Sequence, residues 1–393
     1  KELYDESIYH VDKKWLVSFG YTRDDIIYSI RPMATNAEEA TGSMGDDTPP
    51  AVMSEKPRSL FNYFRQRFAE VTNPPIDPLR EKSVMSLRVL LGSLGNILQE
   101  YVEQDHLIEL MSPILTVEKL CDLKQNKLAS HTLSTLWDIS LGPDGLESAL
   151  SNLQRDTADA VASGCQLLIL SDRGTSNKHT LIPSLLALSA VHHHLLLMGL
   201  RAKVSLIVDS GEPRSIHDCA ALISYGASAI CPYLVLSSLP ILLKEDTNNI
   251  QAELNLVTAL EKGLLKIMSK IGISTIDSYC GAQTFECIGL ANEVVEKYFC
   301  GTPSSLGGAT LKDIARISLV WHALAYGNKS TLSAPGYYKY KRRGELHGFA
   351  PKTVKLLHSA VHTDDILNGN FASGYKKFSE FTQYVSEQPP IYI

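Results

Sequence analysis

The sequence predicts an α/β protein built around a buried parallel sheet, and three apolar runs carry that prediction. The runs at 166–170 and 204–208 each end in a compact polar turn, and a third run lies at 227–231. Helical patterns at 182–200 and 216–225 separate them. Short apolar strands that alternate with helices indicate crossover connections, which place helices on the faces of a parallel sheet.

The composition allows a large core and argues against two classes of partner. The chain has 393 residues, of which 44% are hydrophobic, and its formal net charge is -6. Nucleic-acid or anionic-membrane binding needs a concentrated basic field, and no apolar run has the length of a membrane span. Seven scattered cysteines without a C-x-x-C pair predict buried thiols in a reduced compartment, not a zinc or iron–sulfur site.

The first part of the chain predicts helices joined by an ordered loop. Thr22 is placed to cap a short helix that follows it. The segment 33–52 is rich in Gly, Asp, Thr and Pro and is expected to be a loop. Helical patterns follow at 60–71 and 81–91, and the prolines between them favour an extended path.

The remainder predicts one further strand and a series of helices. The strand is expected at 133–139, and Thr116 is placed as the N-cap of a helix over 117–123. Helical spacing of apolar residues recurs along the rest of the chain. It covers 146–164, 254–271, 291–299, 311–326 and 352–361.

Polar residues directly follow two of the predicted strands. Asp172 and Arg173 come after the first run, and Asp209 and Glu212 come after the second. Enzymes with parallel sheets keep catalytic groups at strand carboxyl ends, so these carboxylates could serve as acid, base or metal ligands. They could equally cap helices and close the sheet through an Asp–Arg pair. The residues alone leave both interpretations open.

Three other stretches suggest sites with less force. The consecutive histidines at 192–194 point about 100° apart on a helix, so they cannot share a metal ion, and one of them is expected to be buried and hydrogen-bonded. The loop at 301–308 lacks the P-loop pattern and is expected to be a structural turn. The basic, aromatic tract at 337–343 is short and is expected to hold one domain against another.

Longer stretches resemble the central region of glutamate synthase and occur in that family's order. They are the tracts at 42–49, 71–78, 170–174, 190–195, 209–212, 225–227, 232–234, 262–270, 281–286 and 301–304. The resemblance covers essentially the whole chain. It departs at Ser305 and Cys280, where the family often has arginine.

The resemblance implies a parent enzyme much larger than this chain. Its large chain combines a glutaminase domain, a central domain, an FMN-binding barrel with a [3Fe-4S] cluster, and a β-helix. It makes two glutamates from glutamine and 2-oxoglutarate, with ammonia crossing an internal tunnel and electrons from ferredoxin or an NAD(P)H-oxidising partner. The chain that begins at Lys1 is expected to be a fragment without catalytic residues, cofactor or metal of its own, from a cytoplasmic or plastid compartment.

The resemblance also implies how the chain divides. Residues 1–58 are expected to be the tail of the glutaminase domain with a connecting loop, 59–110 linker helices, and 111–393 a central α/β domain. In this family the central domain resembles an incomplete (β/α)8 barrel, similar to the FMN barrel, that has lost its cofactor. A helical and irregular N-terminal segment is expected before it.

Two groups of residues therefore receive expected roles. The tunnel or interdomain group is Met44, Asp46, Thr72, Asn73, Asp77 and Arg80, and the structural strand-end group is Asp172, Arg173, Asp209 and Glu212. Two alternatives stay open. One is a free-standing barrel enzyme that acts on a small anionic substrate at the strand ends, and the other is a plain spacer without a tunnel role.

Overall fold

A four-stranded parallel sheet in the order β4-β6-β8-β9 forms the centre of the molecule. Its strands are β4 (Ser130–Ser134), β6 (Leu167–Ser171), β8 (Ser205–Asp209) and β9 (Ala229–Cys231). The computed structural model describes residues 11–39, 46–68, 81–95, 107–243, 248–327, 330–361 and 371–388. The α/β class and the parallel sheet are confirmed, and the three apolar runs supply β6, β8 and β9.

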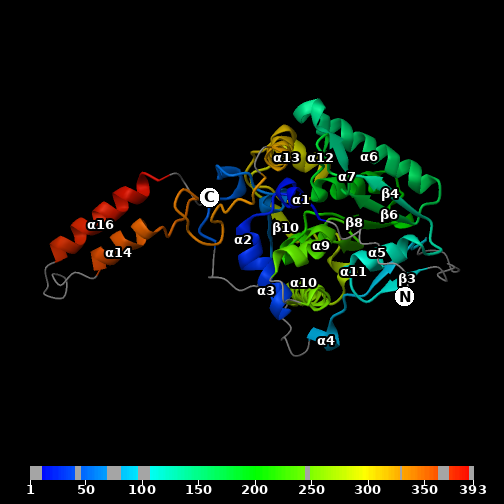
Figure 1. Cartoon of the computed structure of the whole chain (residues 1–393), viewed down its shortest axis with the longest axis horizontal. Coiled ribbons are helices and arrows are strands. Elements are labelled where there is room, and N and C mark those ends of the chain that lie inside the picture. Colours follow the sequence, from blue (N-terminus) through cyan, green and yellow to red (C-terminus); the bar gives the residue numbers. More distant parts are fainter. Residues whose placement is uncertain are drawn as a thin grey trace.

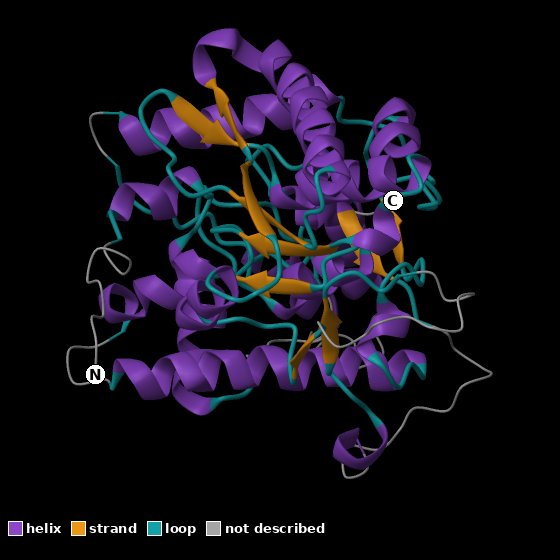
Figure 2. Cartoon of the chain, turned by 90° about the vertical axis from the view of Figure 1, so that its right-hand side faces the viewer, coloured by secondary structure: helices purple, strands orange, loops and turns teal. Residues whose placement is uncertain are grey.

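Helices connect and cover these strands. α6 (Gly145–Ala162) packs on β4, α7 (Ser184–Leu197) on β8, and α8 (Ile216–Ser224) on β9. α9 (Tyr233–Leu242) and α10 (Asn249–Ile271) follow the last strand and pack on each other. Figure 2 shows strands deep inside a shell of helices. Every residue of β6 and β8 is buried, as expected for parallel strands covered on both faces.

Three antiparallel strand pairs surround the main sheet. They are β1 (Phe64–Gln66) with β10 (Phe285–Cys287), β2 (Val89–Leu91) with β3 (Ile108–Leu110), and β5 (Leu136–Asp138) with β7 (His179–Leu181). The remaining short helices lie along the whole chain. They are α1 (Lys13–Ser18), α2 (Arg23–Asp25), η2 (Ile26–Ile30), α3 (Arg31–Asn36), η3 (Ala51–Met53), η4 (Leu60–Tyr63), α4 (Glu81–Val84), α5 (Val117–Lys124), η5 (Ile139–Asp144), η6 (Arg201–Lys203), α11 (Ile276–Tyr279) and α12 (Asn292–Tyr298).

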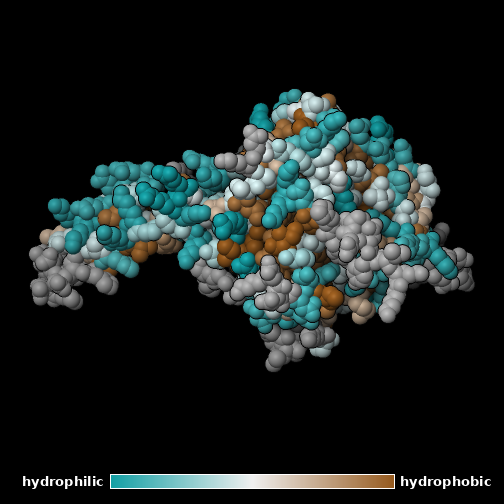
Figure 3. All heavy atoms as spheres, in the orientation of Figure 1, coloured by the Kyte–Doolittle hydropathy of each residue, from teal (hydrophilic) through white to brown (hydrophobic). Residues whose placement is uncertain are grey.

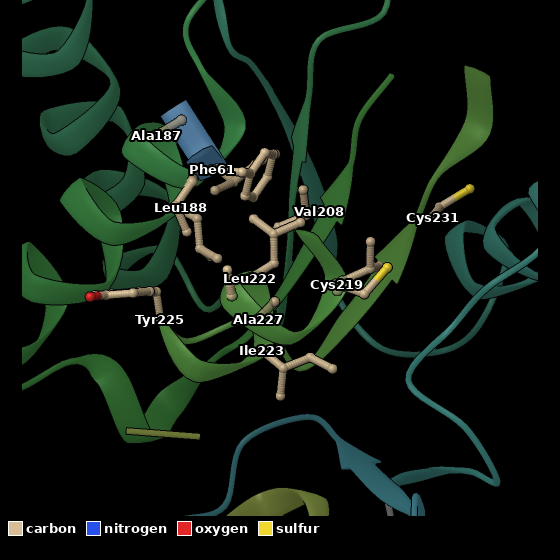
Figure 4. Close-up of a cluster of buried hydrophobic side chains, with 14 of the residues drawn as sticks. Phe61, Ala187, Leu188, Val208, Cys219, Leu222, Ile223, Tyr225, Ala227 and Cys231 are labelled. Carbon is tan, nitrogen blue, oxygen red and sulfur yellow. The ribbon is translucent and has the colours of Figure 1, made fainter. Parts of the chain in front are cut away.

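The N-terminal segment packs onto the body of the protein. α1 lies against α13 (Leu311–Tyr326), and α3 lies against α10. Buried side chains from Val11 to Ala315 belong to one hydrophobic cluster. Figure 4 shows Phe61 in that cluster together with Leu188 and Val208. The segment before the sheet therefore shares its core.

The C-terminal helices form a separate feature. α14 (Pro351–Val361) and α16 (Phe371–Ser386) pack on each other as a hairpin that projects from the body (Figure 1). The first was predicted at 352–361, whereas the second was not predicted. None of the described helices is long and apolar enough to cross a membrane.

Local signals predicted several helix boundaries correctly. The helix predicted at 311–326 is α13. Thr116 caps α5, accepting a hydrogen bond from Lys119 N at 3.3 Å. Thr22 caps α2 and forms a reciprocal capping box with Asp25. These signals depend on neighbours within four residues, so the sequence displays them directly.

The helix predicted over 60–71 is wrong in its described part. η4 makes a single 3-10 turn, and β1 follows it as an edge partner of β10. Phe64 packs its ring 4.9 Å from that of Phe299 and 5.4 Å from that of Tyr225, measured between centroids. These aromatic contacts with distant parts of the chain outweigh the local helical spacing.

Three other predictions need correction. The helix predicted over 81–91 ends with α4, and β2 begins at Val89, because the chain pairs there with β3 in an antiparallel register. The loop predicted at 33–52 is helical at its start, since α3 continues to Asn36. The strand predicted at 133–139 divides at Thr135, whose N–H donates to Ser171 O, and the chain then pairs with β7 as β5.

Candidate functional site

The two predicted polar turns meet at one edge of the sheet. β6 and β8 are neighbours, with Ser171 opposite Asp209, so the turns that follow them lie side by side. The backbone N–H of Asp172 donates to the carbonyl of Asp209 at 3.3 Å. Asp172, Asp209 and Glu212 are each at most 3% exposed. We call these residues with Ser171, Arg173, Ser210 and Gly211 the strand-end cluster.

Asp209 is the charge-paired member of the strand-end cluster. Arg173 donates to it twice, from Nε at 2.8 Å and from Nη2 at 3.1 Å, and Ser171 Oγ donates at 2.9 Å. The Arg173 guanidinium stacks 3.9 Å from the ring centroid of Tyr233. Burial alone would lower the pKa of Arg173, but Asp209 raises it overall. This bidentate pair satisfies both oxygens of the Asp209 carboxylate.

Asp172 is held without a cationic partner among the described residues. Ser210 Oγ and the backbone N–H of Gly211 donate to its carboxyl group, the latter at 3.0 Å. Burial raises the pKa of Asp172 to about 8, and the nearby Glu212 and Asp209 add to the shift. Asp172 is therefore mostly protonated at neutral pH and belongs to a hydrogen-bonded turn.

Glu212 serves the start of a helix. Its carboxylate accepts from the backbone N–H of Ser184, the first residue of α7, at 2.5 Å. Burial raises the pKa of Glu212, although the bond from Ser184 opposes the shift. A carboxylate at a helix N-terminus satisfies a free backbone donor and interacts favourably with the helix dipole.

The N-terminal segment covers the strand-end cluster. Phe19 packs edge-to-face on Tyr233, with ring centroids 6.3 Å apart, and an added Cβ on Gly211 would lie 2.8 Å from its ring. The hydroxyl of Tyr21 donates to the carbonyl of Gly211 at 2.9 Å. Arg214 binds the carbonyls of Phe19 and Gly20 at 3.1 and 3.0 Å. Apolar rings thus occupy the place where a barrel enzyme would hold its ligand.

The strand-end cluster does not suit a flavin or a metal. A flavin phosphate needs free cations or backbone N–H groups, and here Arg173 and the N–H groups of Gly211 and Ser184 already bind carboxyl groups. In the described part of the chain, no group of three or more His, Cys, Asp or Glu could hold a metal ion.

The predicted tunnel residues fall mostly outside the described residues. This applies to Met44, Thr72, Asn73, Asp77 and Arg80. Asp46 is described, and its carboxylate accepts from the backbone N–H and hydroxyl of Thr48 at 2.9 and 2.6 Å. It lines a cavity of about 550 Å³ whose wall contains none of the strand-end cluster, although it includes Arg214 shortly after Glu212. The tunnel assignment therefore stays a prediction.

The three weaker sequence candidates take part in local packing. Arg201 Nε donates to His192 Nδ1 at 3.0 Å, and burial with Arg201 lowers the pKa of His192 to about 3. In the loop at 301–308, Pro303 O accepts from Cys287 N at 2.9 Å. Tyr337 stacks on Arg58 at 4.0 Å. Each of these contacts joins two segments of the protein to one another.

Sequence reasoning missed the residues that cover the site. Phe19, Tyr21 and Arg214 lie in stretches without a motif, and Phe19 and Tyr21 meet the strand ends from nearly 200 positions away. Arg58 was missed for the same reason. The only local signal was the compact turn after β8, which contains Arg214 beside the Asp218 capping box.

Fold and site together define an α/β protein whose usual active-site position is filled by its own side chains. The family model described as the glutamate synthase central domain matches residues 14–291. The chain therefore belongs to the glutamate synthase family.

Curated relatives agree with this assignment. Ferredoxin-dependent glutamate synthase 2 of Synechocystis sp. is 44% identical, and the match covers 95% of this chain and 25% of that protein. The chloroplastic ferredoxin-dependent enzyme of Oryza sativa subsp. japonica is 44% identical over 88% of this chain and 22% of its own length. The NADPH glutamate synthase large chain of Bacillus subtilis is 39% identical over 94% and 24%. The chain spans about a quarter of the length of these relatives.

Solved structures are only weakly similar to this chain. The flavin-binding domain of baker's yeast flavocytochrome b2 aligns over 47% of this chain with 15% identity and a TM-score of 0.31. This likeness is too weak to support an argument about the barrel.

Proposed function

We propose that this chain is the non-catalytic central part of a glutamate synthase. In this proposal it joins the glutaminase domain to the FMN barrel and helps to enclose the path of ammonia between them. The parent enzyme makes two glutamates from glutamine and 2-oxoglutarate, and it takes electrons from ferredoxin or an NAD(P)H-oxidising partner. FMN and the [3Fe-4S] cluster are assigned to other parts of that enzyme.

The engagement of the strand-end cluster is the observation that supports a non-catalytic role. Asp209 is bound twice by Arg173, Asp172 binds Ser210 and Gly211, and Glu212 binds Ser184. A catalytic acid or base must reach a substrate, and here Phe19 and Tyr21 lie over the turns instead. The arrangement fits an incomplete barrel that has lost its cofactor and kept its scaffold.

The surface supports a joining role. An apolar patch lies on the face where Figure 1 places α2 and α9 (Figure 3). Ile27, which follows α2, and Ile241 of α9 are each 41% exposed. The C-terminal hairpin leaves Tyr375 75% exposed. Large exposed apolar groups on one face are typical of contacts with another domain.

The proposed division of the chain has three parts. Residues 1–58 contain the tail of the glutaminase domain, 59–110 connect, and 111–393 form the central domain. We place the parent enzyme in the cytoplasm or a plastid, because relatives include chloroplastic proteins. The remaining three quarters of the relatives' length would carry the chemistry.

Coupling between the two half-reactions tests the tunnel proposal in the whole enzyme. Ammonia is protonated and diluted if it reaches solvent at neutral pH, so an opened wall should lower the glutamate formed per glutamine hydrolysed. We expect this ratio to fall in Met44→Ala and Thr72→Val and to stay unchanged in Met111→Ala, whose side chain is 77% exposed. Unchanged coupling in both wall variants would remove these residues from the tunnel and leave a plain spacer.

Turnover by the chain alone would identify the other alternative. A free-standing enzyme acting on a small anion through Asp172, Arg173, Asp209 and Glu212 should convert substrate without any other domain. The proposal predicts no such activity in the chain itself, measured with glutamine, 2-oxoglutarate and NAD(P)H together. Steady turnover that is lost in Asp209→Asn would overturn the non-catalytic assignment.

A further inference from the structure

A polar cavity of about 550 Å³ has none of the strand-end cluster in its wall. Five segments line it: the N-terminal segment at 20–39, the 46–62 segment, the stretch at 214–218, Trp321 of α13, and Tyr337 with its neighbour Tyr338. Cavities of a few hundred cubic ångströms are the usual size for small-molecule sites. Both acidic and basic side chains line this cavity.

Arg58 is an unmatched charge in the cavity wall. It is 8% exposed, its guanidinium stacks on Tyr337, and Nη2 donates to Thr48 Oγ1 at 3.1 Å. Within the described part of the chain, its buried Nε has no acceptor. Among the described ion pairs, none involves Arg58, and the hydroxyl of Thr48 stands between it and Asp46. A guanidinium has five N–H donors, and within the described residues those of Arg58 meet only the hydroxyls of Thr48 and Tyr337. A buried guanidinium with donors left over is costly unless something completes it.

The carboxylates of the cavity are already engaged. Each one that lines it has a partner within the protein, as a helix cap, a turn or an ion pair. The partners are Arg214 for Asp25, Thr48 for Asp46, His347 for Asp47, Ser215 for Asp218 and Lys266 for Glu39. Asp46 and Asp218 have neutral partners only, so these bonds satisfy their oxygens without cancelling their charge. Arg58 is the charged group of the wall whose own hydrogen bonds are incomplete within the described residues.

Two neutral donors lie close to Arg58 in sequence and line the same cavity. Ser59 precedes η4 without forming a side-chain cap, and Asn62 lies on the exposed side of that turn. No hydrogen bond of either side chain was found within the described residues. Arg58, Ser59 and Asn62 together provide donors that the described residues do not fully satisfy, which is the composition of an anion site.

We propose that this cavity binds a small oxyanion, a carboxylate or a phosphate, through the guanidinium of Arg58. The planar fork of arginine matches the paired oxygens of both groups, and bidentate hydrogen bonds to a charged acceptor are strong. Ser59 and Asn62 add neutral donors on the same side. The bound anion supplies the acceptors that Arg58 lacks. This inference holds whether or not the tunnel proposal is correct.

Thermal unfolding and calorimetric titration of the full chain test the proposal. Sodium glutarate and sodium phosphate are titrated at constant ionic strength, with sodium chloride as the reference salt. A ligand that binds only the folded state raises the midpoint in a saturable way. We expect saturation with glutarate, phosphate or both, but not with chloride, and the more effective anion identifies the group. The absence of saturable binding for both oxyanions would overturn the proposal.

Variants tie the binding to Arg58. Arg58→Met should weaken oxyanion binding more than about tenfold, because a charge-assisted hydrogen-bonded contact is lost. The double variant Ser59→Ala/Asn62→Ala, on the exposed side of η4, should weaken it about fivefold, and it tests the site even if Arg58→Met does not fold. Arg316→Met, on the exposed face of α13, is the matched control and should bind as the unaltered chain does. Equal binding by all three would overturn the assignment.

Discussion

The strand-end cluster and the Arg58 cavity each place an arginine over a tyrosine ring, but only the first gives that arginine a carboxylate partner. Arg173 meets Asp209 with two hydrogen bonds and stacks on Tyr233. Arg58 stacks on Tyr337 in the same way, at 4.0 Å against 3.9 Å, and yet it has only hydroxyls as acceptors among the described residues. A matched buried charge completes a scaffold, whereas an unmatched one indicates a partner from outside.

The N-terminal segment accounts for much of this difference. Its residues Phe19 and Tyr21 lie over the strand ends, where barrel enzymes bind ligands. A few residues later, Asp25 and Tyr28 line the cavity beside Arg58. The N-terminal segment thus covers the strand ends, where the fold class predicts a ligand, and also lines the Arg58 cavity, which the fold class does not predict. Position in a fold is therefore a weaker guide to binding than the balance of buried donors and acceptors.

The same substitution in both regions should give the largest contrast. Arg173→Met leaves Asp209 buried with only the neutral side chains of Ser171 and Cys231 as described partners, and breaking a buried ion pair costs about 3–5 kcal/mol. We expect about 3 kcal/mol, since the Arg173 side chain is 32% exposed and its charge is partly hydrated. Arg58→Met strands no carboxylate and should cost less than about 1 kcal/mol, because the relief of an unmatched charge offsets the lost stacking.

Urea unfolding of the two variants measures this contrast through the shift in midpoint at constant slope. Asp144→Ala serves as the control for an exposed pair, since the Asp144 side chain is 74% exposed and its contact with Lys312 should contribute less than about 1 kcal/mol. Equal losses in the free energy of unfolding in Arg173→Met and Arg58→Met would show that both arginines have equally favourable partners in the folded chain. The comparison between the regions would then fail.

The sequence predicted the parts of the molecule that depend on near neighbours or on complete burial. β6 and β8 could be predicted because strands covered on both faces are continuous apolar runs. The carboxyl ends of neighbouring parallel strands lie side by side. The pairing of Arg173 with Asp209 could therefore be proposed from the sequence, beside the alternative that these residues are catalytic. β1 could not be predicted, since its partner β10 lies some 200 residues later. Arg58 has no carboxylate partner within the described residues. The sequence could not predict this, because it depends on which side chains the fold brings near the guanidinium.

A second prediction sharpens the contrast by disturbing the cover over the strand ends. Gly211→Ala places a Cβ 2.8 Å from the ring of Phe19, and inserting a methyl group into a packed contact costs about 1–3 kcal/mol. Gly307→Ala is the matched control, because an added Cβ there meets nothing within 4 Å. Thermal unfolding should show a lower midpoint only for Gly211→Ala. A second change, Phe19→Leu, should recover part of the loss if the ring is the obstacle.

The smallest expected effect concerns pH. Burial raises the pKa of Asp172 to about 8, while an unfolded aspartate titrates near 3.9. Between these values the folded chain holds a proton that the unfolded chain has lost, so stability should fall as pH rises from about 5 to 8. Asp172→Asn keeps an acceptor for the N–H of Gly211, places an NH2 group beside the Ser210 hydroxyl, which can accept, and cannot ionise.

The urea midpoint of this variant should therefore depend less on pH than that of the unaltered chain, with a difference of at least about 1 kcal/mol across this range, equivalent to one pKa unit. Glu212, whose pKa burial also raises, should leave a residual slope of the same sign. Asp144→Asn, a change at an exposed carboxylate, should leave the pH profile of the unaltered chain in place. If Asp172→Asn follows that profile as well, Asp172 is ionised in the folded chain. The strand-end cluster would then contain an unmatched charge, as the Arg58 cavity does.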